Sequence, residues 1–526
     1  MINDQQTLHD SHQAIREAVI ASREELISEQ LSPEEIASLC KTDITFTLEE
    51  LDRACIRAER GDGDLLIRLF RDRYVFDHRV ELWYRRGEHH WHQDSTLKVM
   101  AATRPLAEAY ENAYIEYSVM AKDAAKAGDK EALAEYRAKR NAIIKKVVKM
   151  NSRKHLENSL AFSTYGDDAL GIEGDQWDRI DYLLPVENGC VNLNTGRCPK
   201  GKPSNWIRKW APTEWHGLNT PCPLWERTLG EIFLDHPEII PYMRRLFGYA
   251  IAGYNIEHVL PIMFGRGRNG KGTIVETISR ILGPLSEPIK AEMLLRQDRT
   301  RSSSGADADL IALMGLRLVW ASETNESRRL NEGKVKWLTG GDTIVARPLY
   351  KKQLTFEPTH TTFLLTNNKP KVKSDDFAMW QRLHLIPFER EFVKRPDPNR
   401  PNQSLADPDL PQKLMGEASG ILAWMVRGHL EWKEKGLDPP RVILAATEEY
   451  RLEEDSIRNF ISENCECADY AKIRAGVFMT AYREWCKNEG IEPETAPKIG
   501  EYMKEYYKVR TGGSRAKWYH GVGLPG

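Results

Sequence analysis

The stretch 264–273, Phe-Gly-Arg-Gly-Arg-Asn-Gly-Lys-Gly-Thr, stands near the midpoint of a chain of 526 residues. An apolar run at 259–264 leads into it, and apolar residues recur at helical spacing after it until Gly283 and Pro284. Strand, glycine-rich turn and helix form the setting in which the pattern G-x-x-x-x-G-K binds phosphate. Glycines let backbone N–H groups approach phosphate oxygens, and a helix N-terminus adds partial positive charge. The stretch therefore predicts a phosphate-binding loop.

Seven residues of this loop are the candidate nucleotide contacts: Gly265, Gly267, Asn269, Gly270, Lys271, Gly272 and Thr273. Lys271 is expected to reach the outer phosphates of ATP. An ordinary glycine-rich turn between strand and helix is the alternative, which the lysine at this spacing disfavours. After the lysine stands Gly272, where such loops normally carry the hydroxyl that ligates Mg²⁺. Either Thr273 or water takes that position, and the sequence leaves the choice open.

Charge and cysteine usage narrow the class of protein. The formal net charge is −2, so any nucleic-acid surface must consist of local basic patches balanced by acid elsewhere. Eight cysteines occur without a C-x-x-C pair, which argues against a zinc ribbon or a disulfide framework and favours a reducing cytosol. No apolar run approaches ~18 residues and the N-terminus is polar, so we expect neither a membrane span nor a signal peptide.

Mainly helical structure is predicted for the first third of the chain. Asp62 and Asp64 would suit the metal site of a primase if they lay on a strand. Helical sequence on both sides instead predicts a turn that links two helices. The later helix at 130–154 is rich in lysine and arginine, and a solvated face and a nucleic-acid contact are equally supported.

A small hairpin is expected over residues 80–93, where apolar and polar residues alternate around Gly87. Its His89, His90 and His92 are candidate metal ligands. Neighbouring residues on a strand point to opposite faces, so a solvated hairpin is favoured over a metal site.

Polar residues flank three further strands downstream of the loop. The apolar strand at 316–323 ends in Glu323, where a P-loop enzyme places the carboxylate that holds magnesium or activates water. The strand at 361–366 leads to Asn367, whose amide is expected to bind the attacking water or the γ-phosphate. Arg382 stands just before another apolar strand. The spacing predicts one site assembled from several strand ends.

A second β-hairpin is predicted within residues 335–356, beyond the turn at Gly340 and Gly341. Its tip is basic and aromatic, which suits phosphate contacts by lysine and base stacking by tyrosine. The candidate DNA contacts are Arg347, Tyr350, Lys351 and Lys352.

Basic and aromatic residues also interleave in the last part of the chain, within a predicted small domain at 455–526 of helices and a final β element. They are Lys498, Tyr502, Lys504, Tyr506, Tyr507, Lys508, Arg510, Arg515, Lys517, Trp518 and Tyr519. A winged-helix DNA contact and a solvated helix with core aromatics both fit this pattern.

The ordered motifs resemble those of superfamily 3 helicases, and among them the phage, plasmid and poxvirus type of primase-helicase. The loop at 265–273, the strand ending at Glu323, the segment 336–356 and the strand ending at Asn367 follow the family's order and spacing. The resemblance covers roughly 175–390. It implies an α/β fold: a P-loop NTPase core of the AAA+-like superfamily 3 type, with a helical N-terminal region and a small C-terminal winged-helix-like domain.

By this resemblance, Lys271 and Thr273 bind nucleotide and Mg²⁺, and Glu323 is the acid, which also ligates the metal. Asn367 is the sensor, and Arg382 is an arginine finger. Ser322 stands where some members have a second acid, so Glu323 would do both tasks. An arginine finger acts on the nucleotide of a neighbouring subunit, which implies a ring, hexameric in the family.

Four domains are expected. They are a mostly helical N-terminal region with a small hairpin (1–165), a pre-motor or collar domain of the primase-helicase family (166–250), the superfamily 3 ATPase core (251–440) and a winged-helix-like DNA-binding domain (441–526).

The function expected from these features is an ATP-dependent DNA helicase, a ring translocase of phage or mobile-element replication in the bacterial host cytosol. Its partners would be single-stranded or forked DNA and a primase or replication initiator, with no membrane. No primase motif is present, so unwinding without primer synthesis is predicted. The alternatives are an ATP-switched origin-binding or scaffold protein without unwinding activity, and a P-loop small-molecule kinase.

Overall fold

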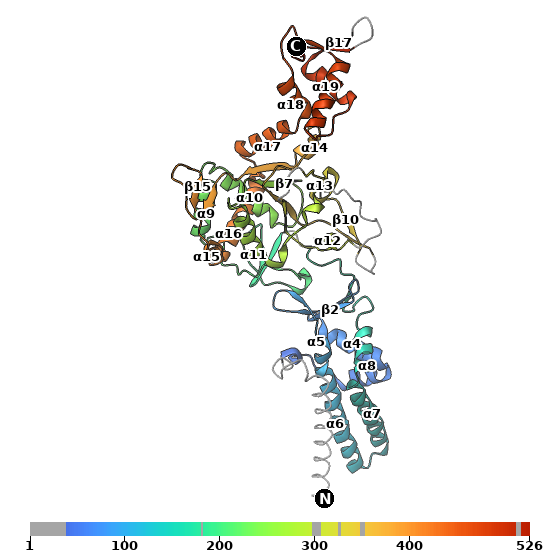
Figure 1. The fold of residues 1–526 in the computed structure, drawn as a ribbon. Helices are drawn as coiled ribbons and strands as arrows, with labels where there is room; N and C mark the ends of the chain where they lie inside the picture. Colours follow the sequence, from blue (N-terminus) through green and yellow to red (C-terminus); the bar gives the residue numbers. More distant parts are fainter. Residues whose placement is uncertain are drawn as a thin grey trace. The chain divides into compact units, whose positions relative to one another are not determined.

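The computed structural model describes residues 38–179, 182–296, 307–323, 328–347, 353–511 and 517–525 (Figure 1). The chain divides into two compact units. Unit 1 comprises 1–180, 188–190 and 199–210, and unit 2 comprises 181–187, 191–198 and 211–526. None of the helices in the described ranges combines the length and apolar character needed to cross a membrane.

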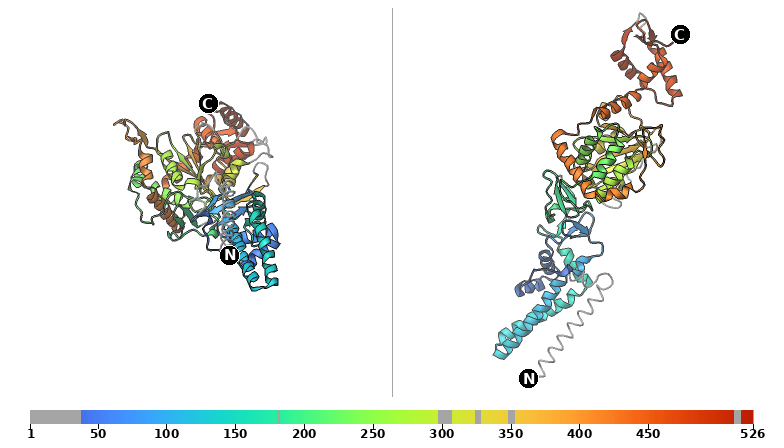
Figure 2. Two further views of the ribbon diagram at one scale, coloured as in Figure 1. Left: turned by 90° about the horizontal axis from the view of Figure 1, so that it is seen from below. Right: turned by 90° about the vertical axis from the view of Figure 1, so that its left-hand side faces the viewer.

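Unit 1 contains a helical bundle whose two long helices lie side by side (Figure 2). Its helices are α3 (Leu48–Ile56), α4 (Ala58–Phe70), α5 (Lys98–Ala101), α6 (Arg104–Ala127), α7 (Lys130–Met150) and α8 (Arg153–Phe162). Gly128 ends α6 in the left-handed region at φ 74°, and the Asp129 side chain caps the first N–H groups of α7.

The turn predicted at Asp62 and Asp64 is wrong, because both residues lie inside α4. Gly61 explains the difference: a Cβ there would lie 2.5 Å from the carbonyl oxygen of Ala54 on α3. The glycine therefore permits close packing of α3 against α4 and does not mark a turn.

A buried polar network surrounds Asp62, whose exposed fraction is 0%. Its carboxylate accepts hydrogen bonds from the Tyr110 hydroxyl at 2.6 Å, the Lys146 ammonium at 2.8 Å and the His155 ring at 2.7 Å. The second ring nitrogen of His155 lies 3.1 Å from Glu59. The basic helix predicted at 130–154 ends at Met150, and Lys146 is the one basic residue of α7 that is turned inward to pair with an acid at the core of unit 1.

A four-stranded sheet completes unit 1 in the order β3-β2-β1-β4. Its strands are β1 (Tyr74–Asp77), β2 (Leu82–Arg86), β3 (Trp91–Gln93) and β4 (Gly171–Ile172). The predicted hairpin is confirmed as β2 and β3, but the solvated setting is wrong, since His89 and His90 are buried. Burial lowers the pKa of His90 to about 4, and its ring stacks on Trp210 at 4.6 Å. Aromatic packing therefore accounts for these histidines, and the described residues hold no cluster of three or more metal-ligating side chains.

Unit 2 is built on a five-stranded parallel sheet in the order β13-β7-β12-β9-β8. The strands are β7 (Leu260–Phe264), β8 (Ser286–Pro288), β9 (Leu318–Glu323), β12 (Thr361–Thr366) and β13 (Leu383–Pro387). Because all strands run the same way, the segments that follow β7, β9 and β12 meet at one edge of the sheet.

Helices cover both faces of this sheet, so unit 2 is a mixed α/β structure with a central parallel sheet. One face packs against α9 (Pro223–Ile232), α10 (Ile239–Ala250), α11 (Lys271–Leu282), α15 (Leu410–Met415) and α16 (Ala418–Lys435). The other packs against α12 (Ala308–Ile311), α13 (Glu332–Thr339), α14 (Phe377–Trp380) and α17 (Arg441–Glu453). Outside these layers lie the strand pairs β5 (Leu183–Val186) with β6 (Gly189–Asn192), β10 (Ile344–Ala346) with β11 (Leu354–Phe356), and β14 (Glu391–Val393) with β15 (Gln403–Leu405).

The last part of the chain has its own apolar core. It contains α18 (Ser456–Asn464), β16 (Lys472–Arg474), α19 (Ala475–Asn488), α20 (Ala496–Tyr506), β17 (Lys508–Thr511) and β18 (Lys517–His520). The three strands form an antiparallel sheet in the order β16-β18-β17. One face of this sheet contributes Ile473 and Tyr519 to the core, with the three helices packed around them.

Candidate nucleotide-binding site

The glycine-rich loop joins the end of β7 at Phe264 to the start of α11 at Lys271. Gly265 has φ 153°, and a Cβ there would lie 2.2 Å from the carbonyl oxygen of Phe388. Gly270 has φ 91°, and a Cβ there would lie 2.5 Å from the side chain of Ile232. Glycine is therefore required at both positions by conformation and by space.

Gly272 differs from Gly270, because a Cβ on it would meet only the Glu276 carboxylate at 3.6 Å. We expect Gly270→Ala to weaken nucleotide binding at least tenfold, since the loop must shift away from Ile232. Gly272→Ala, the matched control in the same loop, should bind within about twofold of wild type. Titration with a fluorescent ATP analogue measures both, and equal losses in the two variants would contradict this geometry.

Lys271 is 7% exposed, and both of its hydrogen-bond acceptors among the described residues are neutral. Its ammonium group donates to the carbonyl oxygen of Gly265 and to the side-chain oxygen of Asn367 at 3.2 Å. Burial lowers the pKa of Lys271 to about 8. A buried cation without a carboxylate partner is suited to receive an anion.

Nucleotide affinity should therefore fall as pH rises. Phosphate binds the protonated lysine, and Lys271 loses its proton as pH passes through about 8. The Kd for an ATP analogue should rise between pH 7.5 and 9, approaching about tenfold per unit above the pKa of Lys271. Lys271→Arg keeps its charge over this range, so its weaker binding should be nearly independent of pH. A wild-type Kd that is flat with pH would contradict the lowered pKa.

A cavity of about 420 Å³ opens at the carboxyl edge of the parallel sheet beside this lysine. It is lined by Gly267, Arg268, Asn269, Gly270, Lys271, Gly272, Thr273, Val275, Glu276, Trp320, Ser322, Leu365, Thr366 and Asn367. The volume is that of a small-molecule site. The indole N–H of Trp320 is buried in the lining without a hydrogen-bond partner among the described residues. Loop N–H groups, one buried cation and this unpaired donor fit a nucleotide.

The predicted nucleotide contacts form two groups: residues that line this cavity and residues that hold the loop in place. Gly267, Gly270, Gly272 and Thr273 line it with Lys271. Gly265 begins the loop and is not part of the lining. The Asn269 amide donates to the carbonyl oxygen of Phe388 at 3.1 Å, which holds the loop against the segment after β13. Asn269 therefore both lines the cavity and fixes the loop.

Glu323 and Asn367 end neighbouring strands. The register pairs Glu323 with Thr366, the residue just before Asn367, so both predicted residues reach the edge that carries the loop. The side chain of Glu323 lies outside the described residues. Thr273 and Ser322 supply hydroxyl oxygens to the lining, and oxygen is the ligand type that Mg²⁺ takes.

Arg382 lies at the opposite end of the sheet. It immediately precedes β13, and its carbonyl oxygen accepts a hydrogen bond from Leu260 N–H at the start of β7. The length of β13 separates it from the loop edge, about 16 Å for five residues. Its guanidinium group donates to the carbonyl oxygen of Ala378 at 2.7 Å. The structure therefore does not bring Arg382 to the cavity of its own subunit.

The hairpin predicted within residues 335–356 is confirmed as the antiparallel pair β10 and β11. Arg347 follows β10 and is exposed, and its backbone is bonded to Asp307. The tip residues Tyr350, Lys351 and Lys352 lie outside the described residues.

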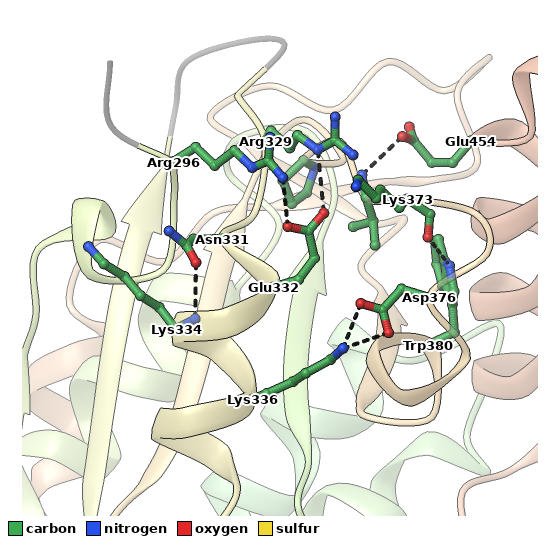
Figure 3. A network of polar contacts seen from close by, with 12 residues as sticks. Arg296, Arg329, Asn331, Glu332, Lys334, Lys336, Lys373, Asp376, Trp380 and Glu454 are labelled. Carbon is green, nitrogen blue, oxygen red and sulfur yellow. Dashed lines mark hydrogen bonds and ion pairs between the residues drawn. The ribbon is translucent and has the colours of Figure 1, made fainter. Parts of the chain in front are cut away.

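A polar network anchors the helix that leads into this hairpin (Figure 3). Asn331 caps α13 by accepting from Lys334 N–H at 3.0 Å. Glu332, in the first turn, accepts from Arg296 at 3.2 Å and from Arg329 at 3.4 Å. The start of α13 is thus fixed by charge-assisted hydrogen bonds.

The same network reaches the loop that follows Asn367 (Figure 3). Lys336 of α13 forms an ion pair with Asp376 at 2.6 Å. The backbone N–H of Val372 donates to Glu454 at 3.0 Å. One set of contacts therefore connects the segment after the cavity residue Asn367 with the helix that precedes the hairpin.

The lining residues that the sequence interpretation did not predict include Glu276 and Trp320. Glu276 lies one helical turn after Gly272, so the spacing of four within α11 could have revealed it. Trp320 lies two residues before Ser322 on β9, and the strand period of two places both on one face.

Two family models and several solved structures resemble parts of this chain. A family model described as "D5 N terminal like" matches residues 63–234, and a "Family of unknown function (DUF5906)" matches residues 263–382. A solved structure, the apo A form of the NrS-1 C-terminal region, aligns over 58% of this chain and 78% of its own with TM-score 0.37 and 13% identity. A likeness this weak bears on neither fold nor function.

Three curated relatives come from large DNA viruses. A "Putative helicase" of Acanthamoeba polyphaga mimivirus is 30% identical over 324 residues, covering 59% of this chain and 33% of the relative. A "Putative helicase" of Frog virus 3 is 28% identical over 246 residues, covering 44% and 25%. A "Putative primase" of African swine fever virus, from a Malawian tick isolate, is 25% identical over 323 residues, covering 59% and 33%.

This chain spans between a quarter and a third of the length of these relatives. The first family model covers unit 1 residues and the segment before the parallel sheet, and the second covers the loop, the cavity and Arg382. Together with the viral relatives, these matches support the resemblance to the phage and poxvirus type of primase-helicase.

Proposed function

We propose that this chain is an ATP-dependent DNA helicase, a ring translocase that unwinds DNA in phage or mobile-element replication. The observation that carries the proposal is the contact between Lys271 and Asn367 beside the cavity. A phosphate-binding cation that already touches the end of β12 gives the protein a way to couple nucleotide state to the segment that follows Asn367.

The chain's own residues would divide the hydrolysis step as follows. Loop N–H groups and Lys271 hold the phosphates, and Asn367 orients the attacking water. Glu323 acts as the acid, and the hydroxyl of Thr273 would hold Mg²⁺ with it. The metal would neutralise charge on the phosphate oxygens.

The position of Arg382 favours a ring of subunits. An arginine about 16 Å from the loop of its own subunit is too distant to stabilise charge on its own nucleotide. A neighbouring subunit that presents Arg382 to the cavity would complete the site, and closed rings are the usual outcome of such head-to-tail contacts. A hexamer is the assembly we propose.

Unwinding of a forked duplex tests this function. Wild type should separate the strands with ATP and Mg²⁺, while Lys271→Ala and Arg382→Ala should not. Lys394→Ala and Arg395→Ala are matched controls, since they remove the same charges from an exposed loop. Wild type that hydrolyses ATP with DNA stimulation but leaves the fork intact would instead favour an ATP-switched origin-binding or scaffold protein.

A further inference from the structure

The antiparallel sheet at the end of the chain has an outer face with an unusual composition. Two cross-strand rows make up this face: Lys472, His520 and Lys508 in one, and Arg474, Trp518 and Arg510 in the other. Residues directly opposite on antiparallel strands share a face, so all six side chains lie on the same side. We call these six residues the outer sheet face.

The other side of the sheet is the core of this region. Ile473 and Tyr519 are each 5% exposed, and Val509 packs beside them. The four cations of the outer sheet face are exposed, and Trp518 and His520 are half-buried. The outer sheet face is therefore open to solvent, with aromatic rings on the central strand and cations on both flanking strands.

Charge is unbalanced on this face. None of its six residues is acidic, and within the described ranges no ion pair joins its four cations to a carboxylate. Lys498 on the nearby helix α20 differs, because it pairs with Asp375 at 2.9 Å and with Glu494 at 2.6 Å. Like charges gathered on one small sheet are unfavourable unless an anion neutralises them.

We propose that the outer sheet face binds single-stranded DNA, with bases stacked on Trp518 and phosphates held by the four cations. Single strands bind where a basic surface follows the backbone and aromatic rings accept unstacked bases. A duplex offers no unstacked base to the indole of Trp518. An acidic peptide would neutralise the cations without stacking on that indole. The exposed side of α20 is less suited to DNA, because Glu501 and Glu505 lie beside Lys504 there.

This inference rests on the proposed function only for the source of its ligand, since unwinding produces single strands. Binding is measured separately from unwinding, with the full chain and no nucleotide. The probe is a fluorescein-labelled oligothymidine of roughly 20 nucleotides, long enough for several stacked bases. Fluorescence anisotropy at several NaCl concentrations gives both the Kd and its dependence on salt.

Trp518→Ala should weaken binding about tenfold, and Trp518→Phe should recover most of it, because a phenyl ring still stacks. Arg474→Ala combined with Arg510→Ala should reduce the slope of log K against log salt by about 1.4, or 0.7 for each phosphate that an arginine no longer neutralises. Circular dichroism and thermal unfolding confirm that each variant is folded.

The matched control is Arg483→Ala combined with Lys487→Ala. These cations are exposed on α19, whose buried residues pack on the core side of the same domain. The control should bind oligothymidine like wild type. The inference is overturned if the control loses as much affinity as the sheet variants, or if Trp518→Ala binds normally. It is equally overturned if a duplex of the same length or a polyglutamate competes as well as single-stranded DNA.

The two proposals fail in different ways. Loss of oligothymidine binding in the sheet variants, with a wild type that does not unwind, would reject the helicase and retain the DNA surface. Unwinding by wild type, with sheet variants that bind normally, would reject the DNA surface and retain the helicase.

Discussion

Replacing Lys271 by alanine should lower the rate of ATP hydrolysis by roughly 10²–10³-fold. The lysine is buried and lines the cavity, where it is expected to contact the outer phosphates. Its removal takes positive charge away from oxygens that become more negative as the phosphate bond breaks. Release of phosphate under saturating ATP and oligothymidine measures the effect.

A loss of folding stability should not be the cause of the slower ATP hydrolysis in Lys271→Ala. Lys271 forms no ion pair with a described residue, and its pKa of about 8 shows that burial disfavours its charge, so alanine should unfold at a temperature no lower than wild type. Lys394→Ala serves as the charge-matched control and should hydrolyse ATP normally. If Lys271→Ala hydrolyses ATP as fast as wild type, the cavity is not the site of ATP hydrolysis.

Replacing Arg382 by alanine should lower the turnover number by about 10³-fold or more, the range for an arginine that stabilises transferring phosphate. The KM for ATP should change little, since an arginine finger acts on charge that develops only in the transition state. Arg395→Ala is the control. A large rise in KM with an unchanged turnover number would assign Arg382 to nucleotide binding instead.

A mixture of Lys271→Ala and Arg382→Ala subunits tests directly whether the two residues act on one site across subunits. A site between a Lys271→Ala subunit and an Arg382→Ala subunit is intact when Lys271 comes from the second and Arg382 from the first. Random assembly at equal amounts should restore about a quarter of the sites, so ATP hydrolysis should rise well above that of either variant alone. If the mixture stays as inactive as its components in hydrolysis, Arg382 does not act across subunits.

Periodic, local patterns predicted the fold of unit 2 well. The strand before the loop, the helix after it and the strands that end at Glu323 and Thr366 all form as expected, because apolar periodicity and glycine position act over short distances. Sheet order could not be read in the same way. Strand pairs such as β13 with β7 join residues more than a hundred positions apart.

The misses have a common physical cause. Gly61 looked like a turn residue, yet it permits a close helix contact that only the folded bundle creates. His90 looked solvated, yet Trp210, distant in sequence, covers it. The cavity shows the same limit: spacing places Trp320 and Ser322 on one face of β9, but only the pairing of β9 with β12 brings that face to the cavity.

The network around Asp62 has a consequence for how the N-terminal unit can evolve. The Asp62 carboxylate accepts hydrogen bonds from Tyr110, Lys146 and His155 at once. Losing it would leave the buried Lys146 ammonium without its ion-pair partner and lower the stability of the fold by about 3–5 kcal/mol. Replacing Asp62 alone therefore leaves three buried side chains without their carboxylate partner. Homologues should therefore keep this set intact or exchange it together for apolar residues, and the four positions should covary in an alignment.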